Sequence, residues 1–105
     1  MVTVSRGEIW WADLSEPIGS SPGFRRPLII VQGDALNRSK ICTVICVPLT
    51  SNVTWAGAPG NVLLSTAITG LSKESVANVY LIWRYEKHRQ QGSGYFTRHC
   101  RQIEN

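Results

Sequence analysis

Short apolar runs, separated by turn-forming residues, account for most of the chain, and none has the sustained 3.6-residue period of a long amphipathic helix. Residues 7–14 ("GEIWWADL"), 26–34 ("RPLIIVQGD") and 41–49 ("ICTVICVPL") are rich in strand-forming side chains. The second and third runs are apolar at successive positions, which is typical of central strands covered on both faces. Residues 61–65 ("NVLLS") and 76–85 ("VANVYLIWRY") complete about five predicted strands.

Turn-forming residues fill the intervals between these runs. Residues 15–26 ("SEPIGSSPGFRR") and 50–60 ("TSNVTWAGAPG") predict two loops, of which the first is long for a hairpin connection. Residues 35–40 are expected to form a turn or a short helical segment. Ser72 and Ser75 are placed to cap a single helical turn.

Residues 86–105 form a tail with no strong period, which either adds one strand at residues 94–99 ("GYFTRH") or stays loose. The sequence contains neither an internal repeat nor an interdomain linker, so we expect one domain over residues 1–105. The fold prediction is mainly β: a small, strongly curved antiparallel barrel or sandwich with short helical segments.

Composition narrows the class of protein. With 43% hydrophobic and 17% charged residues, the chain can build a core. No run approaches the ~20 apolar residues of a membrane span, and the first residues lack the apolar core of a signal peptide. Three cysteines without a CxxC pair argue against a disulfide framework and a zinc site. Cys42 and Cys46 lie an even number of residues apart, so we expect buried thiols on one strand face, in a protein of the reducing cytoplasm.

The charge balance points to an anionic partner. The formal net charge is +4, and arginine outnumbers lysine by eight to three. The guanidinium group is a planar fork that matches phosphate oxygens and stacks on bases. The excess of positive charge therefore favours a nucleic-acid or acidic-protein partner.

Arg25 and Arg26 stand directly before Pro27, at the start of a predicted central strand. Pro27 locks its own φ angle and restricts Arg26 to extended backbone. Arg26 is then held at the rim of a rigid strand and loses less freedom on binding, as expected of a preorganised phosphate clamp. The alternative is a pair of loop arginines that face water, the commonest environment of this residue.

Thr50, Ser51 and Asn52 directly follow the end of the next predicted strand. Short polar side chains at such a position usually cap a turn, but they can also donate hydrogen bonds to a phosphate oxygen. If the two strands pair, Arg26 and Thr50 face one cavity at the rim of the barrel.

Four tryptophans provide large rings: Trp10, Trp11, Trp55 and Trp83. Adjacent Trp10 and Trp11 point to opposite faces of a strand, so at least one of them can leave the core. Packing in the core or between subunits is the alternative role for each ring. Trp55 lies in a predicted loop and is the best candidate to stack on an unpaired base, or else to contact a protein partner.

Five stretches carry a resemblance to a known family: "RGEIWWADL", "RRPLIIVQGDALNRS", "TVICVPLTSN", "PGNVLL" and "TGLSKESVANV". In this order and spacing they resemble the MazF/PemK family of toxin endoribonucleases, over roughly residues 6–79. The resemblance implies an SH3-like barrel of the CcdB/PemK type and a homodimer. It also implies a partner antitoxin that blocks the site, and cleavage of single-stranded mRNA without a metal or other cofactor. Such cleavage leaves a 2',3'-cyclic phosphate and a 5'-hydroxyl.

The family's catalytic arginine directly precedes the proline of the "RP" pair, which makes it Arg26 here, and its catalytic threonine closes the "VPLT" strand end, which makes it Thr50. Arg25 has no fixed role in the family, and we assign it a supporting one. We expect it to bind RNA together with Ser51, Asn52 and Trp55.

Two features leave alternatives open. Tyr80 and Leu81 stand where the family usually has a Ser-Gln pair, and no closing helix is visible in the tail. The general base is unassigned, with Glu8, Asp13, Glu16 and Asp34 as the nearest ionisable candidates. The alternatives are a non-catalytic relative of the gyrase-poison type, which acts by binding a protein, and an inactive barrel that binds nucleic acid.

Overall fold

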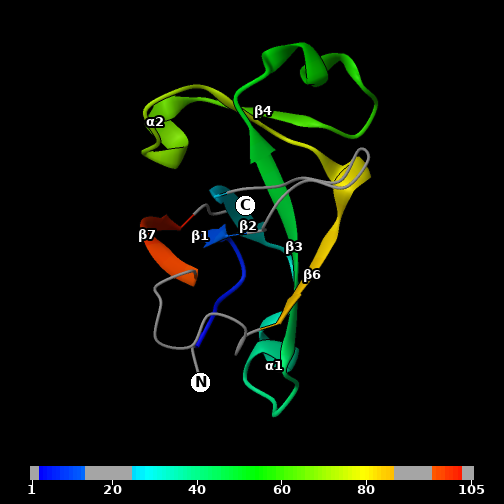
Figure 1. The fold of residues 1–105 in the computed structure, drawn as a ribbon, viewed down its shortest axis with the longest axis vertical. Coiled ribbons are helices and arrows are strands. Elements are labelled where there is room, and N and C mark those ends of the chain that lie inside the picture. The colour runs from blue at the N-terminus through cyan, green and yellow to red at the C-terminus, as the bar shows by residue number, and fades with distance from the viewer. Residues whose placement is uncertain (1–2, 14–24, 87–95, 103–105) are drawn as a thin grey trace.

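The computed structural model describes residues 3–13, 25–86 and 96–102, and it confirms the prediction of a mainly β fold (Figure 1). The strands are β1 (Glu8–Asp13), β2 (Arg25–Ile30), β3 (Thr43–Thr50), β4 (Val62–Leu64), β5 (Ser75–Ala77), β6 (Trp83–Glu86) and β7 (Phe96–Gln102). The helical turns are α1 (Asp34–Asn37), η1 (Val53–Gly57), α2 (Thr66–Thr69) and η2 (Val79–Leu81). All recorded strand pairs are antiparallel, in the order β4-β5-β3-β2-β1-β7, with β6 paired to β3.

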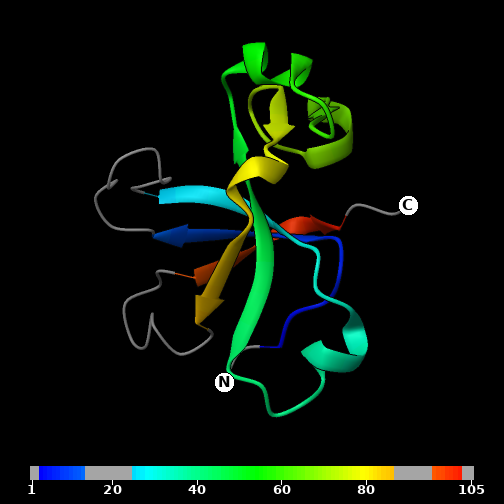
Figure 2. The same ribbon diagram turned by 90° about the vertical axis from the view of Figure 1, so that its right-hand side faces the viewer.

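Strand β3 organises the sheet because it has two partners along one edge. Its first half pairs with β6, as in Cys46 with Trp83, and its end pairs with β5, as in Thr50 with Val76. Its other edge pairs with β2. The sheet therefore turns along β3, and β4 and β5 lie across one end of the molecule (Figure 2). Among the described residues no pairing joins β4 to β7, so the strongly curved sheet is not closed into a complete barrel.

Both faces of the central strands are apolar, and each face builds a core. Because successive side chains of a strand point to opposite faces, the even positions of β1, β2 and β3 enter one cluster and the odd positions enter the other. The first cluster contains Val4, Trp10, Ala12, Leu28, Ile30, Val44 and Cys46. The second contains Ile9, Val47, Leu49, Leu64, Leu71 and Ala77, with Trp11, Ile29 and Val79 packed against it. This two-sided burial is what the continuous apolar runs predicted.

The second cluster is covered by a small unit that we call the cap, formed by η1, β4, α2 and β5 at one end of β3 (Figures 1 and 2). Two asparagine side chains hold it together. Asn61 Oδ1 accepts a hydrogen bond from the Val79 amide at 2.9 Å, and Asn61 Nδ2 donates to the Trp55 carbonyl at 3.0 Å. Asn61 Nδ2 also lies 3.3 Å from Asn78 Oδ1. Because these bonds link residues far apart in sequence, they fix the position of the cap.

One predicted strand is divided in the structure. Residues 76–85 form the end of β5, the turn η2 and β6, instead of one continuous strand. Asn78 causes the break, because its side-chain oxygen accepts a hydrogen bond from the Tyr80 amide at 3.2 Å and so favours a turn over sheet pairing.

Other local predictions have mixed outcomes. The short helical segment expected within residues 35–40 is present as α1, and the tail contributes β7, which pairs with β1. The helical turn expected at Ser72 and Ser75 is wrong: the turn is α2, which ends earlier at Gly70, a residue in the left-handed region with φ of 74°. Most of the predicted loop at residues 15–26 lies outside the described residues.

The cysteine prediction is half correct. Cys46 is buried in β3, but Cys42 precedes the strand and is exposed. Strand β3 begins one residue later, at Thr43, so the face alternation does not extend to Cys42. The third cysteine, Cys100, lies in β7, where the structure describes only the backbone.

Candidate functional site

A pocket of about 230 Å³ opens between the sheet and the cap. The start of β2, the middle of β1 and the end of β3 form one side, and the segment between α2 and β5 forms the other. The described residues that line it are Trp11, Arg25, Arg26, Pro27, Leu49, Ser51, Leu71, Ser72, Lys73 and Ser75. They include three cations and no carboxylate, so the pocket suits an anionic ligand.

Strand pairing brings the aromatic and cationic side chains of the pocket together. Trp11 is opposite Pro27 in the β1–β2 register, and Arg25 lies diagonally from Trp11 on the same face. The Arg25 guanidinium carbon is 5.4 Å from the centre of the Trp11 ring, which is a cation–π distance. Trp11 is half-buried whereas Trp10 is buried, so Trp11 is the member of the pair that packs at the edge of the core and also lines the pocket.

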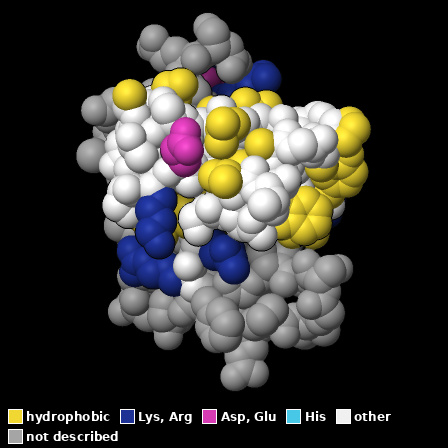
Figure 3. Space-filling model, turned by 90° about the horizontal axis from the view of Figure 1, so that it is seen from above, with side chains coloured by type: hydrophobic (Ala, Val, Ile, Leu, Met, Phe, Trp, Pro, Cys, Tyr) yellow, Lys and Arg dark blue, Asp and Glu magenta, His cyan; other side chains and the backbone are white. Residues whose placement is uncertain are grey.

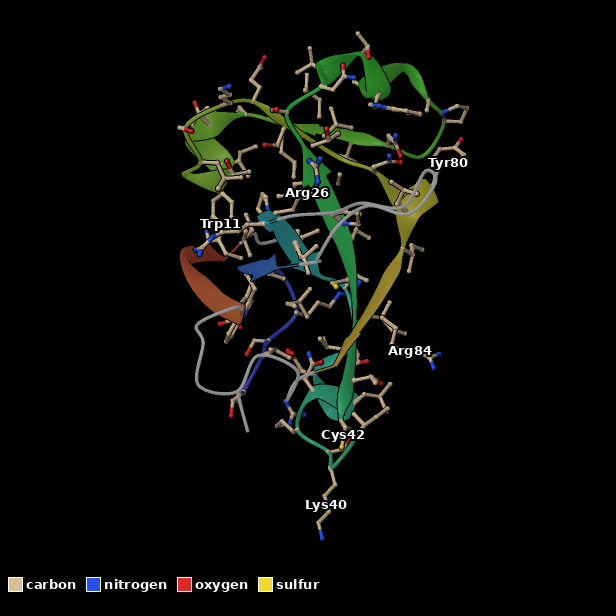
Figure 4. The ribbon with its side chains drawn as sticks, viewed as in Figure 1. Trp11, Arg26, Lys40, Cys42, Tyr80 and Arg84 are labelled. Atoms are coloured by element: carbon tan, nitrogen blue, oxygen red, sulfur yellow. The ribbon has the colours of Figure 1, made fainter. Side chains whose placement is uncertain are left out.

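Arg26 and Thr50 lie at the same end of two neighbouring strands. The last recorded β2–β3 pair is Leu28 with Pro48, and the same register carried two residues further sets Arg26 opposite Thr50. Both positions are even, so strand alternation gives them the same face of the sheet, the one that carries Leu28 and Cys46 and not Leu49. Arg26 is half-buried and lines the pocket, and Figure 4 shows it next to the end of β3, beneath the cap.

The three polar residues at the end of β3 have different environments. Ser51 lines the pocket with Arg26, whereas Thr50 and Asn52 are not among the lining residues. The Thr50 hydroxyl accepts a hydrogen bond from the Asn52 amide at 3.2 Å. Asn52 caps η1, because its side-chain oxygen accepts from the Thr54 amide at 3.3 Å and from the Thr54 hydroxyl at 2.6 Å.

Trp55 lies on η1 in the cap, with 47% of its surface exposed, and does not line the pocket. Its main-chain carbonyl helps to anchor the cap through Asn61, but its exposed ring remains accessible to a ligand. A stacking role for Trp55 therefore stays a prediction, and any base that it holds lies outside the pocket.

Sequence reasoning missed Lys73, Ser72 and Ser75 as site residues. The stretch "GLSKES" reads as a turn, and nothing local in it shows that the cap folds back over β2. The available signal was a lysine in the stretch "SKES", where Glu74 is its acidic neighbour. Figure 3 shows Lys and Arg side chains gathered on one side of the face seen from above, with hydrophobic side chains beside them.

Two of the four candidate bases already hold the local structure. Glu8 is buried, and its Oε1 accepts from the Ser5 amide at 2.8 Å and from Trp10 Nε1 at 3.0 Å. Asp34 accepts from the Arg6 amide at 2.7 Å and from Asn37 Nδ2 at 3.1 Å, and these bonds lower the pKa of Asp34 below its usual 3.8. The side chain of Asp13 and all of Glu16 lie outside what the structure describes, so the base remains unassigned.

The described residues contain neither a metal-binding cluster nor a membrane-spanning helix. No three of their His, Cys, Asp and Glu side chains lie close enough together to hold a metal ion. None of their helices is both long enough and apolar enough to cross a bilayer.

Comparison with known proteins gives a consistent result. Residues 5–99 match the family described as PemK-like, MazF-like toxin of type II toxin-antitoxin system. Endoribonuclease MazF6 of Mycobacterium tuberculosis is 47% identical over 81 residues, which cover 77% of this chain and 71% of that protein. Endoribonuclease EndoA of Bacillus subtilis is 33% identical over 86 residues, covering 82% and 73% of the two chains.

A solved structure supports the fold. The crystal structure of MazF (Form-I) from Deinococcus radiodurans matches with a TM-score of 0.73, covering 99% of this chain and 84% of that one. The sequence identity of this pair is 20%, so the likeness is one of fold.

Proposed function

This chain belongs to the PemK-like, MazF-like family of type II toxin–antitoxin toxins, and from that membership we propose that it is an endoribonuclease that cleaves single-stranded mRNA in the cytoplasm. The observation that carries the proposal is the pocket with three cations beside the ends of β2 and β3, where the recorded register, carried two residues further, sets Arg26 opposite Thr50. Cations and hydrogen-bond donors are the groups that stabilise the negative charge developing on the phosphate oxygens.

The reaction that fits these groups is an internal transfer of the phosphate. The 2'-oxygen of the substrate attacks phosphorus, the bond from phosphorus to the 5'-oxygen breaks, and one proton leaves the 2'-hydroxyl while another reaches the leaving oxygen. The products are a 2',3'-cyclic phosphate and a 5'-hydroxyl, and the reaction as written requires no metal ion.

Arg26 stabilises the charge that grows on the non-bridging oxygens, because a guanidinium group forms short, charge-assisted hydrogen bonds with phosphate oxygens. Thr50 donates a second hydrogen bond to the same group. We assign Arg26 to charge stabilisation and not to proton abstraction, because guanidinium groups remain cationic in proteins. Arg25, Ser51, Asn52 and Trp55 bind the flanking RNA.

The protein partners follow from the family and from the surface. A type II toxin has a cognate antitoxin protein, which we propose covers this basic pocket. We also propose a homodimer, because several large apolar side chains of the cap and of the segment that follows it are about half exposed, and exposed apolar surface is a feature of protein interfaces. They are Val62, Leu63, Ile68, Tyr80 and Ile82.

The test is incubation of the purified protein with a long RNA in EDTA, followed by primer extension and by analysis of the new ends. We expect cuts at a short recurring sequence, 5'-ends that accept phosphate from polynucleotide kinase without prior dephosphorylation, and cyclic phosphate at the 3'-ends. The matched control is the same RNA with 2'-O-methyl groups, which lacks the nucleophile and stays whole. Cutting of the methylated RNA contradicts the proposal, as does inhibition of gyrase without any RNA cleavage.

A further inference from the structure

We propose that Lys73, assisted by Ser72, binds the RNA phosphate next to the one held at Arg26, so that the pocket grips two successive phosphates from opposite sides. This inference rests on the proposed endoribonuclease function and assigns a specific contact to the cap. Neither residue belongs to the catalytic pair.

The geometry comes from the two walls of the pocket. Arg25, Arg26 and Pro27 come from the start of β2, whereas Ser72 and Lys73 come from the segment between α2 and β5, and Ser75 begins β5. A strand of RNA that passes between these walls meets Arg26 on one side and Lys73 on the other. The pocket volume is smaller than the roughly 300–1,000 Å³ of sites that enclose a whole drug-sized ligand. It therefore suits a short stretch of a polymer that continues outside.

Lys73 stands on a fixed backbone although its side chain is exposed. On one side Leu71 is buried in the second core cluster, and its amide donates to the Thr69 hydroxyl at 3.0 Å. On the other side Ser75 is buried in β5, and its hydroxyl donates to the Lys73 carbonyl at 3.3 Å. Because the backbone is held on both sides of Lys73, less conformational freedom is lost when Lys73 binds a ligand. This favours a binding role over that of a passive surface lysine.

Arg26 and Lys73 differ in chemistry and therefore suit different phosphates. Arginine presents a planar fork with fixed directions, which suits the phosphate whose geometry changes during the reaction. The lysine ammonium is a compact charge on a flexible stem, which suits a phosphate that only needs to be held. Arg25 and Arg26 both come from the sheet, so Lys73 is the pocket cation on the cap side that is placed for a second phosphate.

The test compares Lys73→Gln with Lys40→Gln, a matched loss of charge at an exposed lysine. Figure 4 shows Lys40 at the end of the molecule opposite to Trp11 and Arg26. Binding of a single-stranded RNA with 2'-deoxy residues at the cleavage site, which prevents cutting, is measured from 50 to 300 mM salt. One phosphate contact contributes about 0.7 to the slope of log K against log salt for a single strand. We expect Lys73→Gln to lower the slope by about that amount and Lys40→Gln to leave it unchanged.

A second experiment identifies which RNA phosphate Lys73 contacts. Methylphosphonate groups neutralise one RNA phosphate at a time, and the position next to the cut is expected to weaken wild-type binding but not that of Lys73→Gln. On cleavable RNA, Lys73→Gln should raise KM by roughly fivefold with kcat unchanged, since a flanking contact binds substrate and transition state equally.

The outcomes separate this inference from the proposed function. If the wild type cuts RNA but Lys73→Gln keeps the wild-type salt slope, or lowers it no more than Lys40→Gln does, the Lys73 contact is wrong and the nuclease stands. If the wild type cuts no RNA of any sequence, the proposed function is wrong, and with it this inference.

Discussion

Thr50 shows how a residue in a turn can keep a proton available for chemistry. Its hydroxyl oxygen accepts the Asn52 amide, which uses a lone pair and leaves the hydroxyl hydrogen able to donate elsewhere. The same bond fixes the rotation of the side chain at the end of β3. The turn-capping and the phosphate-binding readings of this residue are therefore compatible.

Replacing Thr50 by valine should slow RNA cleavage by about 10²-fold or more, the usual loss when one donor to a developing charge is removed. Valine keeps the branched shape, and the Asn52 amide that loses its partner is exposed and can bind water. Thr50→Ser keeps the donor and is the matched control, expected to cut within about tenfold of the wild-type rate. Cleavage rates measured in RNA gel assays test this prediction. A fully active Thr50→Val variant would show that Thr50 has no role in the mechanism.

Cys42 and Cys46 should differ sharply in reactivity. Burial raises the pKa of the Cys46 thiol from 9.0 to about 12, whereas Cys42 is exposed. The thiolate is the reactive form, so at pH 8 only Cys42 should be alkylated by iodoacetamide in folded Cys100→Ser protein, and both thiols should react in urea. Mass spectrometry locates the adducts. Equal labelling of the two thiols in the folded state contradicts the burial of β3.

The carboxylate of Asp34 should make the stability of the fold depend on pH in the acid range. Its pKa is lowered mainly by the bond from the Arg6 amide and also by that from Asn37, so the folded state favours the charged carboxylate. The stabilisation is present above the ordinary pKa of 3.8 and is lost as the pH falls through the lower pKa of the folded state. Urea unfolding midpoints of wild type and Asp34→Asn should differ near pH 6 and converge toward pH 2. A constant difference over that range contradicts the role of the charge.

At the scale of elements, the pattern of apolar residues was enough for the central strands and for β4, but not for α2, β5 and η2. Strands β1, β2 and β3 lie within two residues of their predicted starts because their apolar runs are buried on both faces. The strand expected at residues 76–85 was divided because Asn78 bonds to the main chain of Tyr80. A single hydrogen bond of this kind leaves no trace in the hydrophobic pattern.

Gly60 lies in the connection between η1 and β4, where the backbone conformation requires glycine. Its φ of 87° lies in the left-handed region, and an added Cβ would be 3.3 Å from Cγ2 of Val79. Gly60→Ala should therefore lower the free energy of unfolding by roughly 1–2 kcal/mol. Gly57, in η1, has nothing within 4 Å of an added Cβ, and Gly57→Ala should change stability by less than about 1 kcal/mol. Urea titration compares the two, and equal effects would show that Gly60 is not constrained.

At the scale of the molecule, the site depends on contacts that sequence spacing does not reveal. Arg26, Thr50 and Ser51 were predicted as site residues because they border apolar runs and match the family motifs. Lys73 reaches the same pocket only because the cap folds over β2, through pairing of β5 with the end of β3. The curvature of the sheet was predicted, but two partners on one edge of β3 could not be, because both partners are short strands.

The most direct test of the account is the rate of RNA cleavage in EDTA by Arg26→Ala, compared with Arg84→Ala. Arg84 is an exposed arginine of β6 that does not line the pocket, so its variant removes the same charge from a different surface (Figure 4). Loss of the group that neutralises the phosphate should slow cleavage by about 10³-fold or more in Arg26→Ala, with the far-ultraviolet circular dichroism of the wild type retained. Arg84→Ala should cut at close to the wild-type rate. A folded Arg26→Ala protein that cuts RNA as fast as Arg84→Ala would contradict the central claim that this guanidinium acts on the scissile phosphate.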